Sequence, residues 1–482
     1  MPPSCCGYLS QYTHHHLVAF LLTFFSYVFL HASRKTFSNV KVSISAQWTP
    51  SPQNGSAPAF SPGETWEKNR LFENEEQATL FLGALDSIFL FSYAVGLYLS
   101  GVIGDRVNLR YVLCFGLCGS AAVGFIFGTL TEWLHIYNVY LYCGLWVLNG
   151  LLQSTVWPCV VAVMANWFGE TGSGFVFGLW SACASVGNIL GAFLASSVLK
   201  YGYEYAFLVT SMVQFAGGVV LFFGLLTSPN EVGLSSDCQT RHDVDTHRPL
   251  INDEEEEHGE RRREPSKAVG FFQAFCLPGV LPYSLAYACL KLVNYSFFFW
   301  LPFYLSNNYG WKEAEADRLS MWYDVGGIVG GTVQGLVTDF LGKRSPVIAL
   351  SLTLAMASLV GYSHSPNDKT SNAVLLAITG FLIGGPSNMI SSAISADLGR
   401  QEAIRGSREA LATVTGIVDG TGSIGAAGGQ YLVSLIESKL GWVAVFYFFV
   451  VMTGTSIMFI SPLILREVRT MWRERQTRHH QL

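Results

Sequence analysis

Long apolar stretches recur along the whole chain and constrain its fold more than any other feature. A helix that spans a membrane needs about 20 mainly apolar residues, and twelve stretches meet this requirement. They cover residues 16–37, 79–101, 110–129, 137–165, 174–199, 204–227, 275–305, 316–338, 345–363, 372–396, 409–435 and 440–465. Only 13% of the 482 residues are charged, about half the usual share in soluble proteins. We therefore expect an all-α membrane protein with twelve transmembrane helices.

The Lys and Arg residues of the connections indicate how these helices are oriented. On the side of the C-terminus, the tail carries five and the connections thirteen, whereas the opposite side carries seven. Because cytosolic loops are rich in Lys and Arg, we expect both termini in the cytosol. Asn54, in the sequon Asn54-Gly55-Ser56, then falls in a lumenal loop and is a candidate glycosylation site.

The longest connection, about residues 228–270, divides the twelve stretches into six and six. It contains NDEEEEHGERRREPSK, a mixed charge run that is typical of a solvated linker. We expect a six-helix half at 1–227, a cytosolic linker at 228–270, a second six-helix half at 271–465 and a basic cytosolic tail at 466–482.

The two halves carry matching motifs. SGVIGDRVNLRY follows the second stretch and QGLVTDFLGKRS ends the eighth; each has Gly four residues before Asp and Arg five residues after it. GLWSACASVG in the fifth stretch matches GIVDGTGSIG in the eleventh at nearly the same offset. Such internal repeats are typical of secondary transporters. The loop Asp can cap a neighbouring helix or pair with its Arg, and the loops are expected to hold one face closed. The candidate gating residues are Gly101, Asp105, Arg106, Arg110, Gly335, Asp339 and Arg344.

This loop motif, on a plan of six helices plus six, resembles the major facilitator superfamily. The resemblance covers nearly the whole chain and implies the major facilitator fold, with two pseudo-repeated halves that alternate access to a central site.

Arg34 and Lys35 lie near the far end of the first stretch, and Lys291 lies inside the seventh. A charge deep in a bilayer costs about 2.5–3.5 kcal/mol on insertion scales, so such groups face the bundle interior or a wet cavity. The first and seventh stretches are equivalent in the two halves, so we expect equivalent cations to meet at a central cavity. Phosphate fits such a pair, because Arg can bind it through two hydrogen bonds. The alternatives are that Arg34 or Lys35 extends to the lumenal interface, or that Lys291 pairs with Asp324 or Asp86.

Three further stretches sharpen the resemblance. SRKTFS, NGLLQSTVWPCVVAVMANWF and GFLIGGPSNMISSAISADL resemble the first-, fourth- and tenth-span signatures of organophosphate:phosphate antiporters, especially the sugar-phosphate exchanger family, solute carrier family 37. The resemblance implies that Arg34 and Lys291 bind phosphate and that Tyr27 lines the same cavity. Bacterial relatives have basic residues where this chain has Leu97, Ala162 and Ala184, which leaves the organic part of the substrate open.

Asp86, Asp324 and Asp419 are carboxylates inside predicted spans. Such groups can couple transport to protons or balance nearby cations; for Asp324 we expect that it balances Lys291. His31 can sense pH or serve in packing.

The sequence thus predicts a secondary transporter that exchanges a phosphorylated or phosphonate-bearing organic anion for inorganic phosphate. The alternatives are a proton-coupled organic-anion exporter, or a transporter-fold scaffold or sensor subunit. No nucleotide-binding loop, metal-ligand spacing or nucleophile motif occurs in a suitable context, so we expect no enzyme, no cofactor, no metal and no nucleic-acid partner. An accessory membrane subunit is left open. DTHRPLI at 245–251 resembles an acidic dileucine sorting signal, which favours an endosomal or lysosomal membrane over the endoplasmic reticulum.

Overall fold

The computed structural model describes residues 13–49, 71–72, 75–168, 173–198, 201–233, 270–311, 313–400 and 411–480. Asn54, the sorting-like segment 245–251 and nearly all of the expected linker lie outside these residues. Most of the described residues inside the predicted spans are helical, with short breaks such as those at 181–182 and 276–279.

The first half consists of six membrane-crossing segments, three of which are interrupted. They are α2 (His14–Trp48), α3 (Glu75–Gly104), α4 (Leu109–Phe125) with the π-helical turn η2 (Ile126–Leu130) and α5 (Thr131–Trp133), α6 (Val139–Ser154) with α7 (Val156–Phe168), α8 (Ser173–Trp180) with α9 (Cys183–Val198), and α10 (Tyr203–Gly224). A 3₁₀ turn, η4 (Pro229–Val232), follows.

The second half repeats this order. After the short α11 (Phe271–Phe275) come α12 (Val280–Tyr309), α13 (Glu313–Leu341), α14 (Ser345–Ser363), α15 (Lys369–Met389) with the π-helical turn η6 (Ile390–Ile394) and α16 (Ser395–Leu398), α17 (Leu411–Leu440), and α18 (Trp442–His480). Two helices extend beyond the predicted spans. Helix α2 continues to Trp48, past residue 37, and α18 continues as one helix to His480, through most of the predicted tail.

The expected fold class is confirmed. Within the described residues, nine helical segments are long and apolar enough to cross a membrane. The long helices α12, α13 and α17 complete the two sets of six, and they carry Lys291, Asp324 and Asp419. These charged side chains lower the hydropathy of the helices that bear them. The same three helices contribute to the central cavity.

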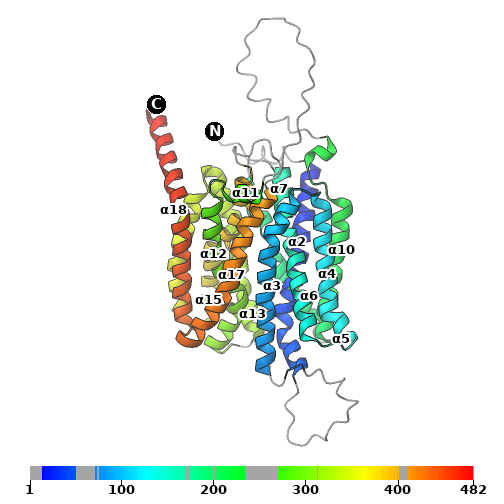
Figure 1. Ribbon diagram of the computed structural model, residues 1–482. Helices are drawn as coiled ribbons and strands as arrows, with labels where there is room; N and C mark the ends of the chain where they lie inside the picture. Colours follow the sequence, from blue (N-terminus) through cyan, green and yellow to red (C-terminus); the bar gives the residue numbers. More distant parts are fainter. Residues whose placement is uncertain are drawn as a thin grey trace, which may run out of the picture.

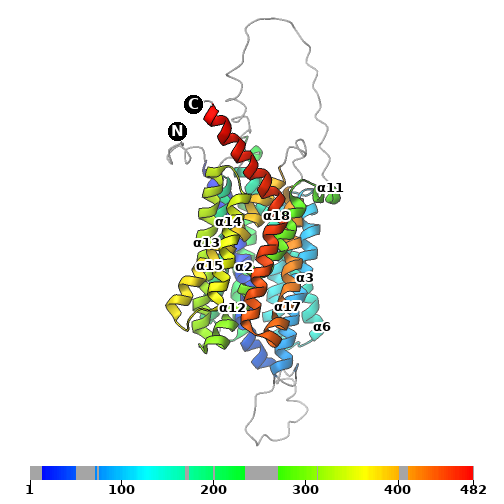
Figure 2. The ribbon, with the colours of Figure 1, turned by 90° about the vertical axis from the view of Figure 1, so that its left-hand side faces the viewer.

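The two halves stand side by side, and the start of α2 and the end of α18 lie at the same end of the bundle (Figures 1 and 2). The halves meet mainly along two helix pairs, α3 with α17 and α8 with α13, and α7 also contacts α17. Glycines permit both contacts. A Cβ at Gly101 would lie 2.6 Å from the Ala412 carbonyl oxygen, and one at Gly178 would lie 2.2 Å from that of Gly331.

The two loop carboxylates cap helices of the opposite half. Asp105 accepts hydrogen bonds from the backbone N–H groups of Ala412 (2.9 Å) and Thr413 (2.7 Å), at the start of α17. Asp339 accepts one from Phe175 (2.7 Å), at the start of α8. These contacts satisfy backbone donors that a helix N-terminus leaves free. We name the two contacts the N-terminal caps.

The other candidate gating residues have different surroundings. Arg110 pairs with Glu231 at 2.8 Å, and Arg344 hydrogen-bonds Asp397 and lies 3.8 Å from Asp339. Arg106 is exposed, and Gly335 is buried in α13.

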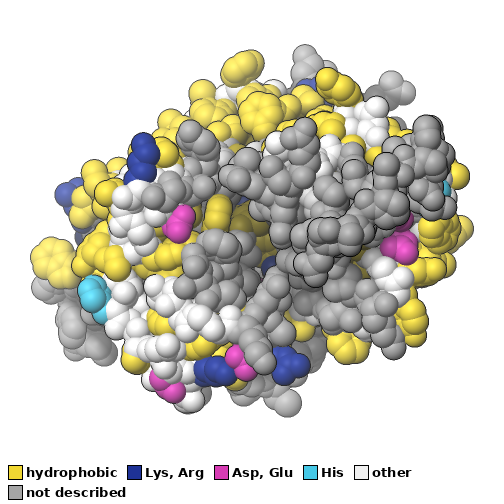
Figure 3. Space-filling view, turned by 90° about the horizontal axis from the view of Figure 1, so that it is seen from below, with side chains coloured by type: hydrophobic (Ala, Val, Ile, Leu, Met, Phe, Trp, Pro, Cys, Tyr) yellow, Lys and Arg dark blue, Asp and Glu magenta, His cyan; other side chains and the backbone are white. Residues whose placement is uncertain are grey.

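Apolar side chains of both halves also close the end of the bundle where α2 starts and α18 ends. Ala393, Ala396, Leu411 and Ala412 of the second half belong to a buried cluster formed mainly by residues of the first half. The Trp157 indole N–H also donates to the Ser391 carbonyl oxygen across the two halves (3.3 Å). Seen from the opposite end, the surface is hollowed near its centre (Figure 3). The structure is therefore closed on the side of the termini.

Gly178→Ala should destabilise the protein by about 1–3 kcal/mol, because the added methyl group overpacks the contact of α8 with the α13 backbone. Gly144→Ala is the matched control, since a Cβ there meets nothing within 4 Å and Ala favours helix. Thermal unfolding of the purified variants measures both effects. Equal melting temperatures for the two variants would contradict the tight contact.

Asp105→Ala should open the end that carries the termini, because the variant loses a cap that links the two halves. Cys159 is buried behind this contact, with its sulfur close to Gly104. In a protein whose other cysteines are replaced, Cys159 should react with thiol reagents several-fold faster when Asp105 is also changed to Ala than when Asp105 is kept. Asp368→Ala removes a cap within one half, from Ser371 of α15; it should cost about 0.5–2 kcal/mol without exposing Cys159. Equal labelling in both variants would contradict a gating role for Asp105.

Candidate binding site in the central cavity

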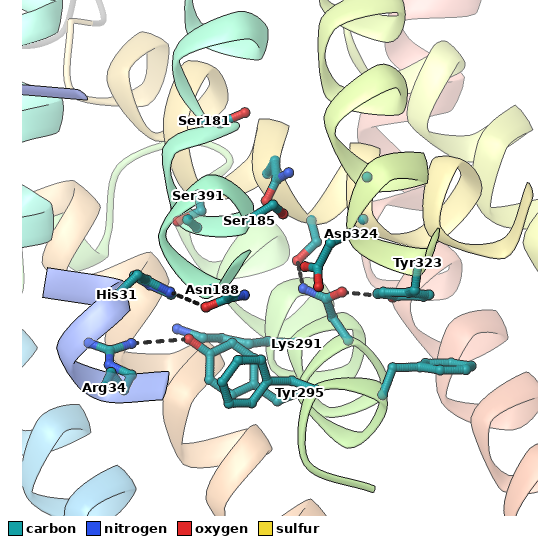
Figure 4. Close-up of a pocket in the computed structure, with 18 of the residues that line it drawn as sticks. His31, Arg34, Ser181, Ser185, Asn188, Lys291, Tyr295, Tyr323, Asp324 and Ser391 are labelled. Carbon is teal, nitrogen blue, oxygen red and sulfur yellow. Dashed lines mark hydrogen bonds between the residues drawn. The ribbon is translucent and has the colours of Figure 1, made fainter. Parts of the chain in front are cut away.

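A polar cavity lies between the two halves, near the middle of the helices (Figure 4). It offers about 100 Å³ to the centres of water molecules, where one water needs roughly 10–15 Å³. A small organic anion therefore has room to bind. Its lining includes Tyr27, His31, Arg34, Lys35, Asn188, Lys291, Asn294, Tyr295, Asp324, Ser391 and Asp419. The cavity thus brings together all four predicted substrate-binding residues and two of the three predicted acids.

Arg34, on α2, is held by neutral partners. Its Nε donates to Gln153 Oε1 at 3.0 Å, and its Nη1 is 3.5 Å from the Tyr295 hydroxyl. Its guanidinium lies over the Tyr93 ring, 4.6 Å from the ring centroid. The remaining nitrogen, Nη2, is buried and has no hydrogen-bond partner among the described residues. Arg34 therefore keeps a donor that can bind an anion.

Lys291, on α12, is fully engaged. Its Nζ donates to Asp419 Oδ1 at 2.9 Å and to Ser423 Oγ at 2.8 Å, and both charged side chains are almost completely buried. Ser391 donates to the same Asp419 oxygen at 3.2 Å. The expectation that Asp324 balances Lys291 is wrong, because α17 rather than α13 presents its carboxylate to Lys291.

Asp324 belongs to a second cluster. Its carboxylate is hydrogen-bonded by Ser185 and Asn188 and lies near Lys35. Asn188 Oδ1 also lies 3.0 Å from His31 Nδ1, so one chain of contacts joins α2, α9 and α13. The Lys35 ammonium lies over the Phe298 ring, 4.1 Å from the centroid. Lys35 therefore faces the cavity wall from α2 while its neighbour Arg34 faces Gln153.

Tyr27 lies one turn before His31. It is buried and packs against Trp157 with 4.5 Å between the centroids of the two tilted rings, and its ring centroid lies 4.8 Å from that of His31. Asp86 does not line the central cavity. It lines a smaller space of about 30 Å³ on the other side of Arg34, together with Asn149 and Gln153.

Four glycine contacts fix how α2 corresponds to α12. They are Gly187 with Val28, Gly425 with Ala288, Gly191 with Ala32, and Gly429 with Leu292. Gly187 and Gly425 are repeat partners, and so are Gly191 and Gly429. The α2 and α12 residues that they contact are therefore equivalent, and both comparisons give an offset of 260 residues (288 − 28 and 292 − 32). Lys291 therefore corresponds to His31, and Arg34 corresponds to Asn294. The two cations face one cavity but are not equivalent positions, contrary to the expectation from the repeat.

Sequence reasoning missed several residues that hold the two cations. Gln153 and Tyr93 position Arg34, and Ser391 and Ser423 complete the Lys291 pair. Gln153 could have been identified from the sequence, because a polar side chain inside an apolar span often belongs to a functional site. Ser423 could have been identified as the repeat partner of Ser185, which contacts Asp324.

A family model described as Major Facilitator Superfamily matches residues 23–407. Two solved structures share the fold. They are the proton:xylose symporter XylE bound to 6-bromo-6-deoxy-D-glucose (TM-score 0.66, 14% identity, 93% of this chain and 96% of that one) and the human organic anion transporter MFSD10 (TM-score 0.62, 13% identity, 92% and 99%). The fold and the charged central cavity define a membrane protein of the major facilitator class.

Curated relatives match over nearly the full length. Sugar phosphate exchanger 3 of Gallus gallus is 69% identical over 99% of this chain and 97% of its own length, and that of Homo sapiens is 70% identical over 97% and 96%. Putative glycerol-3-phosphate transporter 5 of Arabidopsis thaliana is 37% identical over 95% and 93%. The chain belongs to the sugar-phosphate exchanger family of the major facilitator superfamily, which confirms the resemblance carried by the span signatures.

Lys291→Met should lower the free energy of unfolding by about 3–5 kcal/mol, because it leaves the Asp419 carboxylate buried without its cation. The double variant Lys291→Met/Asp419→Asn should recover most of this loss, since replacing both members of a buried pair is often nearly neutral. Thermal unfolding in detergent compares the two. A double variant no more stable than Lys291→Met would contradict the pair.

Proposed function

We propose that the protein exchanges a phosphorylated or phosphonate-bearing organic anion for inorganic phosphate by alternating access. One observation carries the proposal: Arg34, whose buried Nη2 has no hydrogen-bond partner among the described residues, lines a cavity shared with Lys291. A phosphoryl group has several acceptor oxygens and matches the fork of a guanidinium. Arg34 grips the group directly, and Lys291 supplies a second positive charge from the other half.

The names of the relatives support the same substrate class. Besides the sugar phosphate exchangers and the plant glycerol-3-phosphate transporter, a glucose-6-phosphate exchanger of Xenopus tropicalis is 36% identical over 94% of this chain and 93% of its own length. Amide and hydroxyl side chains on the cavity wall, among them Asn188, Asn294 and Ser387, suit the hydroxyl groups of a sugar. The protein then acts as a carrier rather than as an enzyme.

Alternating access supplies the transport step. With the termini in the cytosol, the structure is the state closed to the cytosol, and the N-terminal caps and the shared apolar cluster hold it closed. Rocking of the two six-helix halves, 1–227 and 271–465, separates the caps, opens the cytosolic side and closes the lumenal side. Asn54 then carries a lumenal glycan. We place the protein in an endosomal or lysosomal membrane, with the endoplasmic reticulum as the alternative.

Counterflow in proteoliposomes tests the proposal. Vesicles loaded with phosphate should take up labelled phosphate, and competing sugar phosphates and phosphonates should reduce that uptake. Arg34→Ala and Lys291→Ala should each reduce exchange at least about 30-fold, because losing a buried charged partner costs roughly 2–5 kcal/mol. Lys369→Ala is the control; this lysine is exposed and pairs with Glu315 at 3.0 Å. No counterflow by folded wild-type protein would refute phosphate exchange.

A further inference from the structure

We propose that Asp419 is a built-in counter-anion of the empty site. It occupies Lys291 while no substrate is bound, and it competes with the incoming phosphoryl group for that lysine. The inference rests on the proposed function and concerns how the same site is regulated.

The two cations differ in what they offer to a ligand. An ammonium group has three donors, and Lys291 directs its donors to Asp419 Oδ1, to Ser423 Oγ and, at 3.5 Å, to the Asp419 carbonyl oxygen. Arg34 has five donors and leaves Nη2 unpartnered among the described residues. An anion can therefore bind Arg34 as the structure stands, but it must take the place of Asp419 to bind Lys291.

The surroundings of the Asp419 carboxylate suit a phosphoryl oxygen as well. Asp419 and Ser391 both line the cavity, and the Ser391 hydroxyl donates to the carboxylate oxygen that Lys291 also binds. An oxygen of the substrate at that point would receive the same two donors. Rotation of one side chain on α17 exposes them. Asp419 thus mimics the charge and the hydrogen bonds of the substrate.

The charge balance of the cavity follows from this arrangement. Three cations and two carboxylates line it, Arg34, Lys35, Lys291, Asp324 and Asp419, which leaves a formal charge of +1. Without Asp419 the empty carrier would reorient with a bare ammonium in its core, which is costly in a bilayer. With Asp419 in place, Lys291 is neutralised and does not slow the reorientation of the empty carrier across the membrane. We therefore expect some phosphate efflux even without an anion outside the vesicle. Two unpaired cations in the cavity would instead make the empty carrier reorient slowly.

Asp419→Asn tests the proposal in purified protein and in proteoliposomes. Removing the competing charge should tighten inorganic phosphate binding about tenfold, by loss of short-range repulsion. The ratio of efflux with external phosphate to efflux without it should rise, because the empty variant retains an unpaired ammonium. Asp324→Asn is the matched control. Its carboxylate contacts Ser185 and Asn188 and lies near Lys35 rather than Lys291, so both quantities should change far less.

Two outcomes would overturn the proposal. One is that Asp419→Asn binds phosphate no more tightly than the wild type; the other is that Asp324→Asn produces an equal change, which would reflect only the total charge of the cavity. Absence of phosphate binding and exchange in the wild type would instead refute the proposed function.

A second pair of variants keeps the test valid if Asp419→Asn folds poorly. Lys291→Met leaves Asp419 facing the cavity unpaired, so phosphate should protect this variant least against thermal unfolding. Lys291→Met/Asp419→Asn should regain part of the protection through Arg34. Equal protection of the two variants would show that Asp419 does not compete with the anion.

Discussion

A full charge inside the hydrocarbon region of a membrane needs a partner, and the arrangement of this protein depends on how each buried charge finds one. Lys291 and Asp419 neutralise each other across α12 and α17. Asp324 lies near Lys35. Arg34 has only amide, hydroxyl and aromatic neighbours and retains an unpartnered nitrogen among the described residues. The cavity therefore holds one cation that is prepared for a ligand and one that is already occupied.

The closed end of the bundle depends on a different physical feature, which is the set of free N–H groups at a helix start. Asp105 and Asp339 reach across the boundary between the halves and cap α17 and α8. These contacts are polar and short, so they can break when the halves rock. The close glycine contacts along the same helix pairs need no side-chain rearrangement.

Much of this could be predicted from the sequence. The twelve apolar stretches fixed the helices because span length and hydropathy are local properties. The matching loop motifs indicate the two halves and point to Asp105 and Asp339, because a Gly and an Arg stand at the same distances from each Asp. The partner of Lys291 could not be predicted, because it depends on how α12 and α17 are rotated about their axes. The same reason explains why Lys291 aligns with His31 rather than with Arg34. Helix ends such as Trp48 and His480 were also not predicted from hydropathy, because a helix continues past the membrane wherever its residues favour helix.

The most direct measurement is a pair of cryo-electron microscopy structures, one without phosphate and one at saturating phosphate. The account predicts density for the anion within hydrogen-bonding distance of Arg34 Nη2, with the Asp419 side chain rotated away from Lys291. Density at another site, or an unchanged cavity under conditions where exchange is observed, would contradict the claim that these two cations bind the phosphoryl group.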